Sequence, residues 1–303
     1  MGLRNLLYST FLSGVLAFNG CNKDSPVEPV NHAPVIEQIV ASDYEPFTEE
    51  RVSLECVASD EDDDNLIYDW RCDKGYFSTV DERIVSWYSP ENVGVSHITA
   101  KVDDGKMGTD SHSLDLRVVS RFDTILVSED AYVDRLNPNL NTQNSSYTKN
   151  GLNLYKDDEG ISKEVYLKFN LDVIQMEIKS AKLRLVVKGL MTYPDVELSC
   201  DMHMSKGVWN ENNLTWVNRP DYDITPIKRF LVPRLLNSSD PEIFYVEGLI
   251  DFVKSSMNNP SQNNGLVIKP IEQDIGKILC SKEGAIDTLK VVDYIPALIV
   301  EYE

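Results

Sequence analysis

Basic and aromatic side chains occupy alternate positions in two segments of this sequence, residues 164–171 and 181–188. In both segments apolar and polar residues alternate, which predicts β-strands with one face in a core and the other in solvent. The outward positions hold Tyr166, Lys168, Lys182, Arg184 and Lys188. Arginine's planar fork binds a carboxylate through two parallel hydrogen bonds, and lysine adds a point charge.

These positions predict one basic, partly aromatic surface if the two strands are neighbours, as we expect. Lys149, Tyr155 and Lys156 would join that surface from the preceding strand. A surface of this kind suits a ligand that carries carboxylates, for example a chain of uronate sugars. An ordinary solvated strand face is the alternative.

Two tryptophans, Trp209 and Trp216, flank a turn that also holds Glu211 and Thr215. A flat aromatic face suits a pyranose ring, so a sugar-stacking platform is one interpretation. A packed corner that joins two strands is the other.

An acidic loop holds three alternating carboxylates, Asp60, Asp62 and Asp64. We expect the turn that contains Asp103 and Asp104 to lie near it. Calcium prefers oxygen ligands of this kind, so the group is a candidate calcium site. A solvated acidic loop is the alternative.

The elements that would position these residues indicate an all-β protein with two domains, residues 34–121 and 122–303. The first region is a series of short alternating runs separated by turn signals, which is typical of an Ig-like β-sandwich. The second region continues the strand pattern and contains one helical segment, residues 248–257. Many strands with one short helix predict a larger jelly-roll β-sandwich.

The charge balance argues against nucleic acid as a partner. The 303 residues include 29 Lys+Arg and 49 Asp+Glu, a formal net charge of -20. Nucleic acids are bound by cationic surfaces, and the sequence has neither a basic stripe nor an aromatic RNA-binding motif. Solubility at a cell surface is one explanation of this acidity, and calcium binding is a more specific alternative.

The N-terminus has the layout of a secretory signal, with Arg4 before an apolar run from Leu6 to Phe18. That run is shorter than the roughly 20 residues that a membrane span requires. Phe18-Asn-Gly-Cys21 resembles the bacterial lipoprotein box, in which the cysteine is lipidated and becomes the first mature residue. An ordinary signal peptide with an incidental cysteine is the alternative.

The lipoprotein resemblance implies a signal peptide at 1–20 and a polar, lipidated tether at 21–33. Lys23-Asp24 resembles the surface-export signal of Bacteroidota lipoproteins. A lipid anchor holds a protein at a membrane without spanning it. The expected location is therefore the outer membrane or the cell surface, with the membrane contacted through lipid alone.

Four further cysteines remain, two in each predicted domain. An even number in an oxidising compartment permits disulfides, and the natural pairs are Cys56–Cys72 and Cys200–Cys280. The alternative is four buried thiols.

The first region resembles the PKD-type Ig-like domains of bacterial surface proteins. The resemblance rests on Ala58-Ser-Asp-Glu-Asp-Asp-Asp-Asn-Leu-Ile-Tyr-Asp-Trp70, on Gly75, and on Val102-Asp-Asp-Gly105. Asp63 stands where that family usually has a glycine. The resemblance implies a spacer domain.

The second region resembles the DNRLRE family of secreted bacterial β-sandwiches, which includes alginate-binding modules. The resemblance rests on three segments, of which the last is the most specific: Asp130-Ala-Tyr-Val-Asp-Arg-Leu-Asn-Pro-Asn-Leu-Asn141, Ile178-Lys-Ser-Ala-Lys-Leu-Arg-Leu185 and Trp209-Asn-Glu-Asn-Asn-Leu-Thr-Trp-Val-Asn-Arg-Pro220. Tyr294-Ile-Pro departs from that family near the last strand. The resemblance implies binding of an acidic polysaccharide such as alginate. The regularity of the tryptophan motif across the family favours a structural role for Trp209 and Trp216.

Catalysis has little support in the sequence, which has four histidines and neither a nucleophile elbow nor a metalloprotease motif. A glycosidase or a polysaccharide lyase is a minor alternative. The main alternative to glycan binding is a structural or adhesive surface protein with a protein partner. We expect no required cofactor, and calcium is a candidate structural ion.

Overall fold

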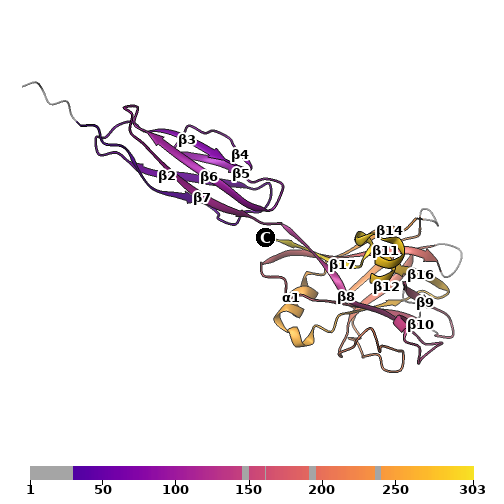
Figure 1. The fold of residues 1–303 in the computed structure, drawn as a ribbon. Helices are drawn as coiled ribbons and strands as arrows, with labels where there is room; N and C mark the ends of the chain where they lie inside the picture. The colour runs from indigo at the N-terminus through magenta and orange to yellow at the C-terminus, as the bar shows by residue number, and fades with distance from the viewer. Residues whose placement is uncertain (1–29, 145–149, 161, 191–195, 236–239) are drawn as a thin grey trace, which may run out of the picture. The chain divides into compact units, whose positions relative to one another are not determined.

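The computed structural model describes residues 30–303 except 145–149, 161, 191–195 and 236–239 (Figure 1). The chain forms two compact units. Unit 1 ends at Arg117, and unit 2 runs from Val118 to Glu303 together with the short segments 47–49 and 91–94. Among these described residues, no helix is long and apolar enough to cross a membrane.

Unit 1 is a β-sandwich of two sheets. One sheet has the strand order β1-β2-β5-β4, and the other has β3-β6-β7. Alternation puts Trp70 of β3 and Trp87 of β5 in the core, where they are 1% and 0% exposed. The bounds are β1 Val35–Ala41, β2 Arg51–Ser59, β3 Ile67–Cys72, β4 Tyr76–Phe77, β5 Ile84–Tyr88, β6 Gly94–Asp103 and β7 Thr109–Val118.

Unit 2 is a larger β-sandwich, so the all-β prediction of two sandwiches is confirmed. Its strands pair in the order β13-β12-β15-β10-β8-β17-β11-β16-β9, β9 also pairs with β10, and β14 pairs with β11. The bounds are β8 Phe122–Asp134, β9 Gly151–Lys156, β10 Ser162–Phe169, β11 Ile178–Leu190, β12 Leu198–Met204, β13 Lys228–Val232, β14 Glu242–Glu247, β15 Leu266–Pro270, β16 Ile275–Cys280 and β17 Ala297–Tyr302.

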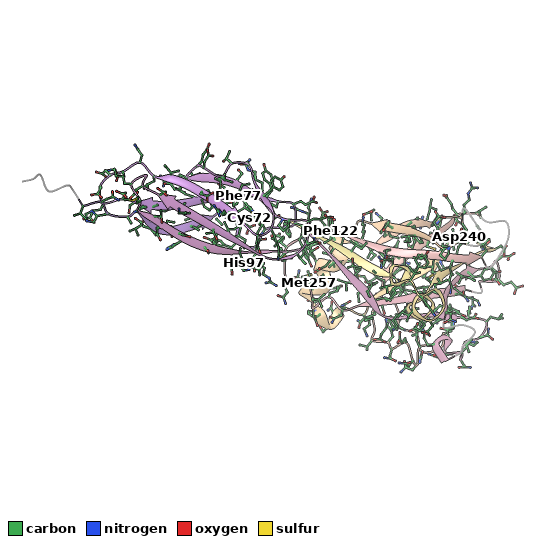
Figure 2. The ribbon with its side chains drawn as sticks, turned by 45° about the horizontal axis from the view of Figure 1, so that its top comes forward. Cys72, Phe77, His97, Phe122, Asp240 and Met257 are labelled. Carbon is green, nitrogen blue, oxygen red and sulfur yellow. The ribbon has the colours of Figure 1, made fainter. Side chains whose placement is uncertain are left out.

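The core of unit 2 lies between its two layers, and Figure 2 shows side chains filling that space. In β11 the residues Ala181, Leu183, Leu185 and Val187 all belong to this core, as the alternating pattern predicts. Their neighbours on the strand must therefore point outward.

Strand β8 pairs with different strands along its two halves. Its first half pairs with β17, and its second half pairs with β10 after a register shift opposite Lys168 and Phe169. An extra residue at such a bulge bends and twists the strand. Because β8 bends there, the outer faces beside β10 and beside β11 belong to different parts of the sandwich.

The predicted helix is confirmed as α1, Ile250–Asn258, which buries Phe252, Val253 and Ser256. The backbone N–H of Leu249 donates to the carbonyl of Ala181 at 2.9 Å, which fixes the start of the helix against β11. Short helical turns at Gly284–Leu289 and Val292–Tyr294 precede β17; the strand pattern does not predict them.

Candidate functional site

Tyr166 and Lys168 point outward from β10, as predicted, but the segment 205–222 covers them. Tyr166 is 0% exposed and packs with Trp209, Leu214 and Val267 in a second small core. The Lys168 ammonium pairs with Glu129 at 2.8 Å. Burial raises the pKa of the Tyr166 hydroxyl above its usual range. The prediction that these two side chains form an open binding surface is therefore wrong.

Trp209 is the centre of that covering segment. Its ring is 4% exposed and meets the Tyr166 ring edge-on, with 5.6 Å between the centroids. Its indole N–H donates to the carbonyl of Asn264 at 2.7 Å. Trp216 is partly buried beneath the Arg219 guanidinium, 3.6 Å from the ring centroid. The turn is a packed corner, as the structural interpretation predicts.

A buried cluster of charges fastens the same corner to β8. The ammonium of Lys282 donates to both carboxylate oxygens of Glu211, at 2.9 and 3.1 Å. The backbone N–H of Lys282 donates to Asp130 at 2.6 Å. Burial, and then the nearby Glu283 carboxylate, raise the pKa of Asp130 to about 8. Asp130, Glu211 and Lys282, which are far apart in the sequence, thus meet in a cluster that holds the corner in place.

Lys182 and Arg184 lie on a different and more open surface, formed by β14, β11 and β17. Lys182 stands opposite Glu247 of β14 and Ile299 of β17, and Arg184 stands opposite Tyr245 and Ala297. Side chains directly opposite each other in antiparallel strands share a face. We call this surface the β11 face and define it by Lys182, Arg184, Ile243, Tyr245 and Ile299.

Tyr245 is the residue that the sequence analysis missed. Its side chain is 47% exposed, and the Lys182 ammonium lies 4.7 Å from its ring centroid. Lys182 also pairs with Glu247 at 3.7 Å, where the two side chains are 37% and 67% exposed. A partly exposed ammonium thus lies over the face of a partly exposed aromatic ring on this sheet face.

Arg184 is less accessible than predicted, because it is 8% exposed. One guanidinium nitrogen pairs with Asp293 at 3.4 Å, and another donates to the carbonyl of Ile295 at 3.3 Å. Its Nε is buried without a hydrogen-bond partner. Because the Asp293 side chain is 78% exposed, it is the member of the pair that a ligand carboxylate could replace.

The expected single surface does not form, because β10 and β11 are not neighbours. Strands β8 and β17 lie between them in the strand order, and β8 pairs with β17 and with β10 along different halves of its length. Lys156 donates to the carbonyl of Ile271 at 3.2 Å, and Lys188 donates to that of Asn150. Burial lowers the pKa of Lys188. Lys149 lies outside the described residues.

In unit 1, Asp60, Asp62 and Asp64 do come together, with ligand oxygens within 4.8 Å of one another. Lys106 pairs with Asp64 Oδ1 at 2.6 Å. One oxygen each of Asp60 and Asp64 is buried without a hydrogen-bond partner.

The two expected neighbours of this acidic loop have partners of their own. Asp104 accepts hydrogen bonds from Asn31 and from the N–H groups of Lys106 and Gly108, and Asp103 accepts one from Gly105. Among the described residues, only three of the five predicted ones bring their oxygens together, and Asp62 of that group also accepts a hydrogen bond from the backbone N–H of His32 at 2.6 Å.

All four described cysteines are free thiols, so the prediction of the disulfides Cys56–Cys72 and Cys200–Cys280 is wrong. Cys56 stands opposite Ile39 in the β1-β2-β5-β4 sheet, whereas Cys72 stands opposite Ile98 in the β3-β6-β7 sheet. Cys72 itself contacts the carbonyl of Gly75. Burial raises the pKa of Cys56 to about 11.

The second pair is apart as well. Cys200 pairs with Phe230 and Pro270, whereas Cys280 pairs with Gly151 at the end of β16. Burial raises the pKa of the Cys280 thiol to about 11.

Comparison with solved structures finds chains of low overall similarity. One, described as showing the structural basis for the promiscuous specificity of carbohydrate-binding modules of the β-sandwich superfamily, is 13% identical and matches 90% of this chain and 98% of its own, at a TM-score of 0.28. Another is a Bacteroides ovatus protein, SGBP-B of the mixed-linkage glucan utilization locus, in complex with a heptasaccharide. It is 8% identical and matches 78% of this chain and 50% of its own, at a TM-score of 0.21. No curated protein matches the sequence.

The family comparison is more decisive. Residues 121–290 match the model of carbohydrate-binding module family 96. The matched segment holds the packed tryptophan corner, the charge cluster beneath it and most of the β11 face. Since it also makes up more than half of the sequence, the protein belongs to carbohydrate-binding module family 96.

Proposed function

We propose that unit 2 binds an acidic polysaccharide, such as alginate, along the β11 face. The observation that carries the proposal is the exposed Tyr245 ring with the Lys182 ammonium 4.7 Å from its centroid. An aromatic ring packs against the C–H face of a pyranose, and an ammonium beside it attracts a uronate carboxylate.

Arg184 would supply the second cation of the site. It lies two residues from Lys182 on the same strand face, a separation of about 7 Å. A ligand carboxylate would replace Asp293, whose side chain is 78% exposed and lies 3.4 Å from the Arg184 guanidinium.

Because the proposed binding depends on charge pairing, its affinity should fall as the salt concentration rises. Exposed charges are screened over about 8 Å at physiological ionic strength. The protein's net charge of -20 also repels a polyanion at long range, so binding must depend on the local cations. We therefore expect affinity for alginate to depend on Lys182 more than on the overall charge.

The experiment compares alginate binding by the wild-type protein, Lys182→Ala and Tyr245→Ala, using isothermal titration. Lys206→Ala is the matched control. Lys206 does not belong to the β11 face, and its ammonium forms a similarly exposed ion pair with Asp223, at a distance of 3.0 Å. Tyr76→Ala is the control for the ring, because Tyr76 is 63% exposed in unit 1. We expect both β11-face variants to lose affinity at least about 5-fold and both controls to bind as the wild type does. Unchanged binding by both β11-face variants would refute the proposed site.

A protein partner is the second candidate ligand. The same sheet face exposes Ile243 and Leu126, which are 39% and 40% exposed, and exposed apolar groups favour protein contacts. If no acidic or neutral polysaccharide binds in the titrations, this structural or adhesive function replaces the first.

The remaining parts of the chain would present this module at the cell surface. We propose that Cys21 carries the lipid, that the polar segment after it is a tether, and that unit 1 is a PKD-type spacer. The motifs in the sequence support this arrangement. Unit 2 is proposed to bind its ligand without catalysing a reaction.

Calcium is proposed as a structural ion of unit 1. Asp60 Oδ1 accepts the N–H groups of Asp62 and Asp64, which shapes the loop, while Asp60 Oδ2 and Asp64 Oδ2 remain buried and unpartnered. Hard oxygen donors of this kind fit calcium. The bound ion would neutralise carboxylates that otherwise repel one another.

A further inference from the structure

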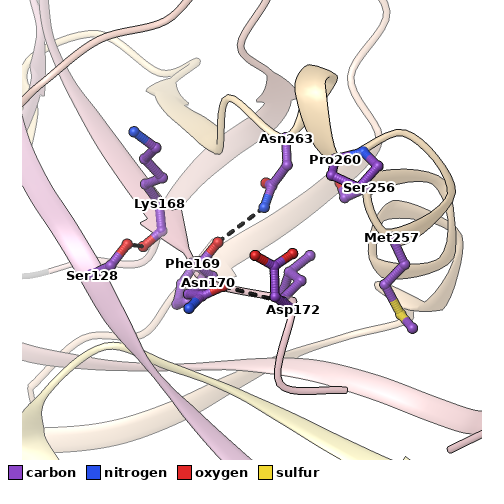
Figure 3. Close-up of a pocket in the computed structure, with 10 residues that line it drawn as sticks. Ser128, Lys168, Phe169, Asn170, Asp172, Ser256, Met257, Pro260 and Asn263 are labelled. Atoms are coloured by element: carbon purple, nitrogen blue, oxygen red, sulfur yellow. Dashed lines mark hydrogen bonds between the residues drawn. The ribbon is translucent and has the colours of Figure 1, made fainter. Parts of the chain in front are cut away.

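A cavity in unit 2 is lined by none of the residues that define the β11 face. It has a volume of about 340 Å³, at the small end of the range of about 300–1,000 Å³ for small-molecule sites. It lies between the end of β10 and helix α1 (Figure 3). We call it the β10–α1 pocket and define it by Asn170, Asp172, Ser256, Met257, Pro260 and Asn263.

Ser256 gives the pocket an unused hydrogen-bonding group. The residue is 2% exposed, and its hydroxyl has no partner among the described residues. Buried hydroxyl groups almost always have a hydrogen-bond partner, because leaving one unpaired is costly. A helical serine commonly bonds to the carbonyl four residues earlier, but Ser256 does not.

Asn263 adds a second unused group. Its amide nitrogen donates to the carbonyl of Phe169 at 3.0 Å, which fixes the side chain, while its Oδ1 is buried without a partner. The fixed amide therefore presents an acceptor that is already oriented. The exposed Asp172 carboxylate lies on the same side, between the strand end and the helix (Figure 3).

The charges of the pocket disfavour an anionic ligand. Lys168 lines the pocket, but its ammonium pairs with Glu129 at 2.8 Å, and its side chain extends away from Asp172 in Figure 3. Asp172 would repel a carboxylate and accept hydrogen bonds from neutral hydroxyl groups. Met257 and Pro260 supply apolar surface on one side, which suits the C–H face of a sugar ring.

We propose that the β10–α1 pocket binds one neutral hexopyranose unit through its hydroxyl groups. Ser256, Asn263 and Asp172 would contact those hydroxyls, and Met257 with Pro260 would pack against the ring. The inference rests on the proposed carbohydrate binding, but it does not depend on the β11 face. The pocket is too small for more than one or two sugar rings, so it suits a single unit rather than a long chain.

The test measures binding of D-glucose, D-galactose, D-mannose and D-glucuronate to the whole protein by saturation-transfer NMR. The variants are Ser256→Ala and Asp172→Ala, and Ser255→Ala is the matched control because it removes an exposed hydroxyl from the same helix. We expect a neutral hexose to bind the wild type and the control, and each pocket variant to bind it about 3- to 10-fold more weakly. Ser256→Ala should not lower the melting temperature, since the lost hydroxyl has no partner.

The same proteins separate this inference from the proposed function. Alginate binding should survive Ser256→Ala, and hexose binding should survive Lys182→Ala. If the wild-type protein binds a hexose but no alginate, the proposed function of the β11 face is refuted and the pocket proposal stands. The pocket proposal is overturned if no hexose binds, if the pocket variants bind hexose as the wild type does, or if D-glucuronate binds more tightly than the neutral sugars.

Discussion

Replacing Trp209 by alanine should destabilise unit 2, because this ring fills the small core that covers β10. The ring is 4% exposed, and truncation of a buried tryptophan costs about 3–5 kcal/mol. The lost hydrogen bond to Asn264 adds about 1 kcal/mol. At roughly 2–4 °C per kcal/mol for a domain of this size, the melting temperature should fall by about 8–24 °C.

Differential scanning calorimetry measures this change on the whole protein. Trp209→Phe should lose less than Trp209→Ala, because it keeps an aromatic ring against Tyr166 and loses the indole N–H. Trp216→Ala should also lose less, because Trp216 is only partly buried. A Trp209→Ala protein that melts as the wild type does and no longer binds polysaccharide would refute the packed corner and restore the stacking platform.

Three further predictions concern other parts of the chain. The pKa of Asp130 is raised to about 8 in the folded protein. The protonated Asp130 carboxyl therefore contributes fully to stability below the ordinary aspartate pKa near 4, and this contribution is lost as the pH rises toward about 8. Asp130→Asn should therefore flatten the fall in melting temperature between pH 5 and pH 8.5, and an equally steep fall would contradict this. If calcium binds Asp60, Asp62 and Asp64, removing it with a chelator should lower the melting temperature of unit 1. Calcium at 100 times its dissociation constant contributes about 2.7 kcal/mol to the free energy of unfolding. An identical melting temperature with and without chelator would show that the loop is solvated and binds no calcium. Cys21→Ser should move the protein from the membrane fraction to the soluble fraction, and equal membrane retention of the variant would exclude the lipid anchor.

Alternation predicted the strands and the outward direction of most site residues, because side-chain direction in a strand follows from local sequence. Tyr166 does point outward from β10. The pattern could not show that the segment 205–222 would cover it, because that contact joins residues far apart in the chain. The same limit explains the error about neighbouring strands, since sheet order depends on long-range pairing.

Tyr245 was missed for a local reason. The general strand pattern of residues 122–303 includes it, but Ile243, Phe244, Tyr245 and Val246 place large side chains on both faces. Without a polar alternation, the sequence does not show which ring is exposed. The regular motif around Trp209 was interpreted correctly as structural, because its residues fasten a corner in place.

The most direct test of the central claim is a crystal structure of the protein with a short alginate oligosaccharide. We predict a sugar ring over Tyr245, with its carboxylate within hydrogen-bonding distance of the Lys182 ammonium. An oligosaccharide bound at another face, or no bound sugar at saturating concentration, would contradict the account.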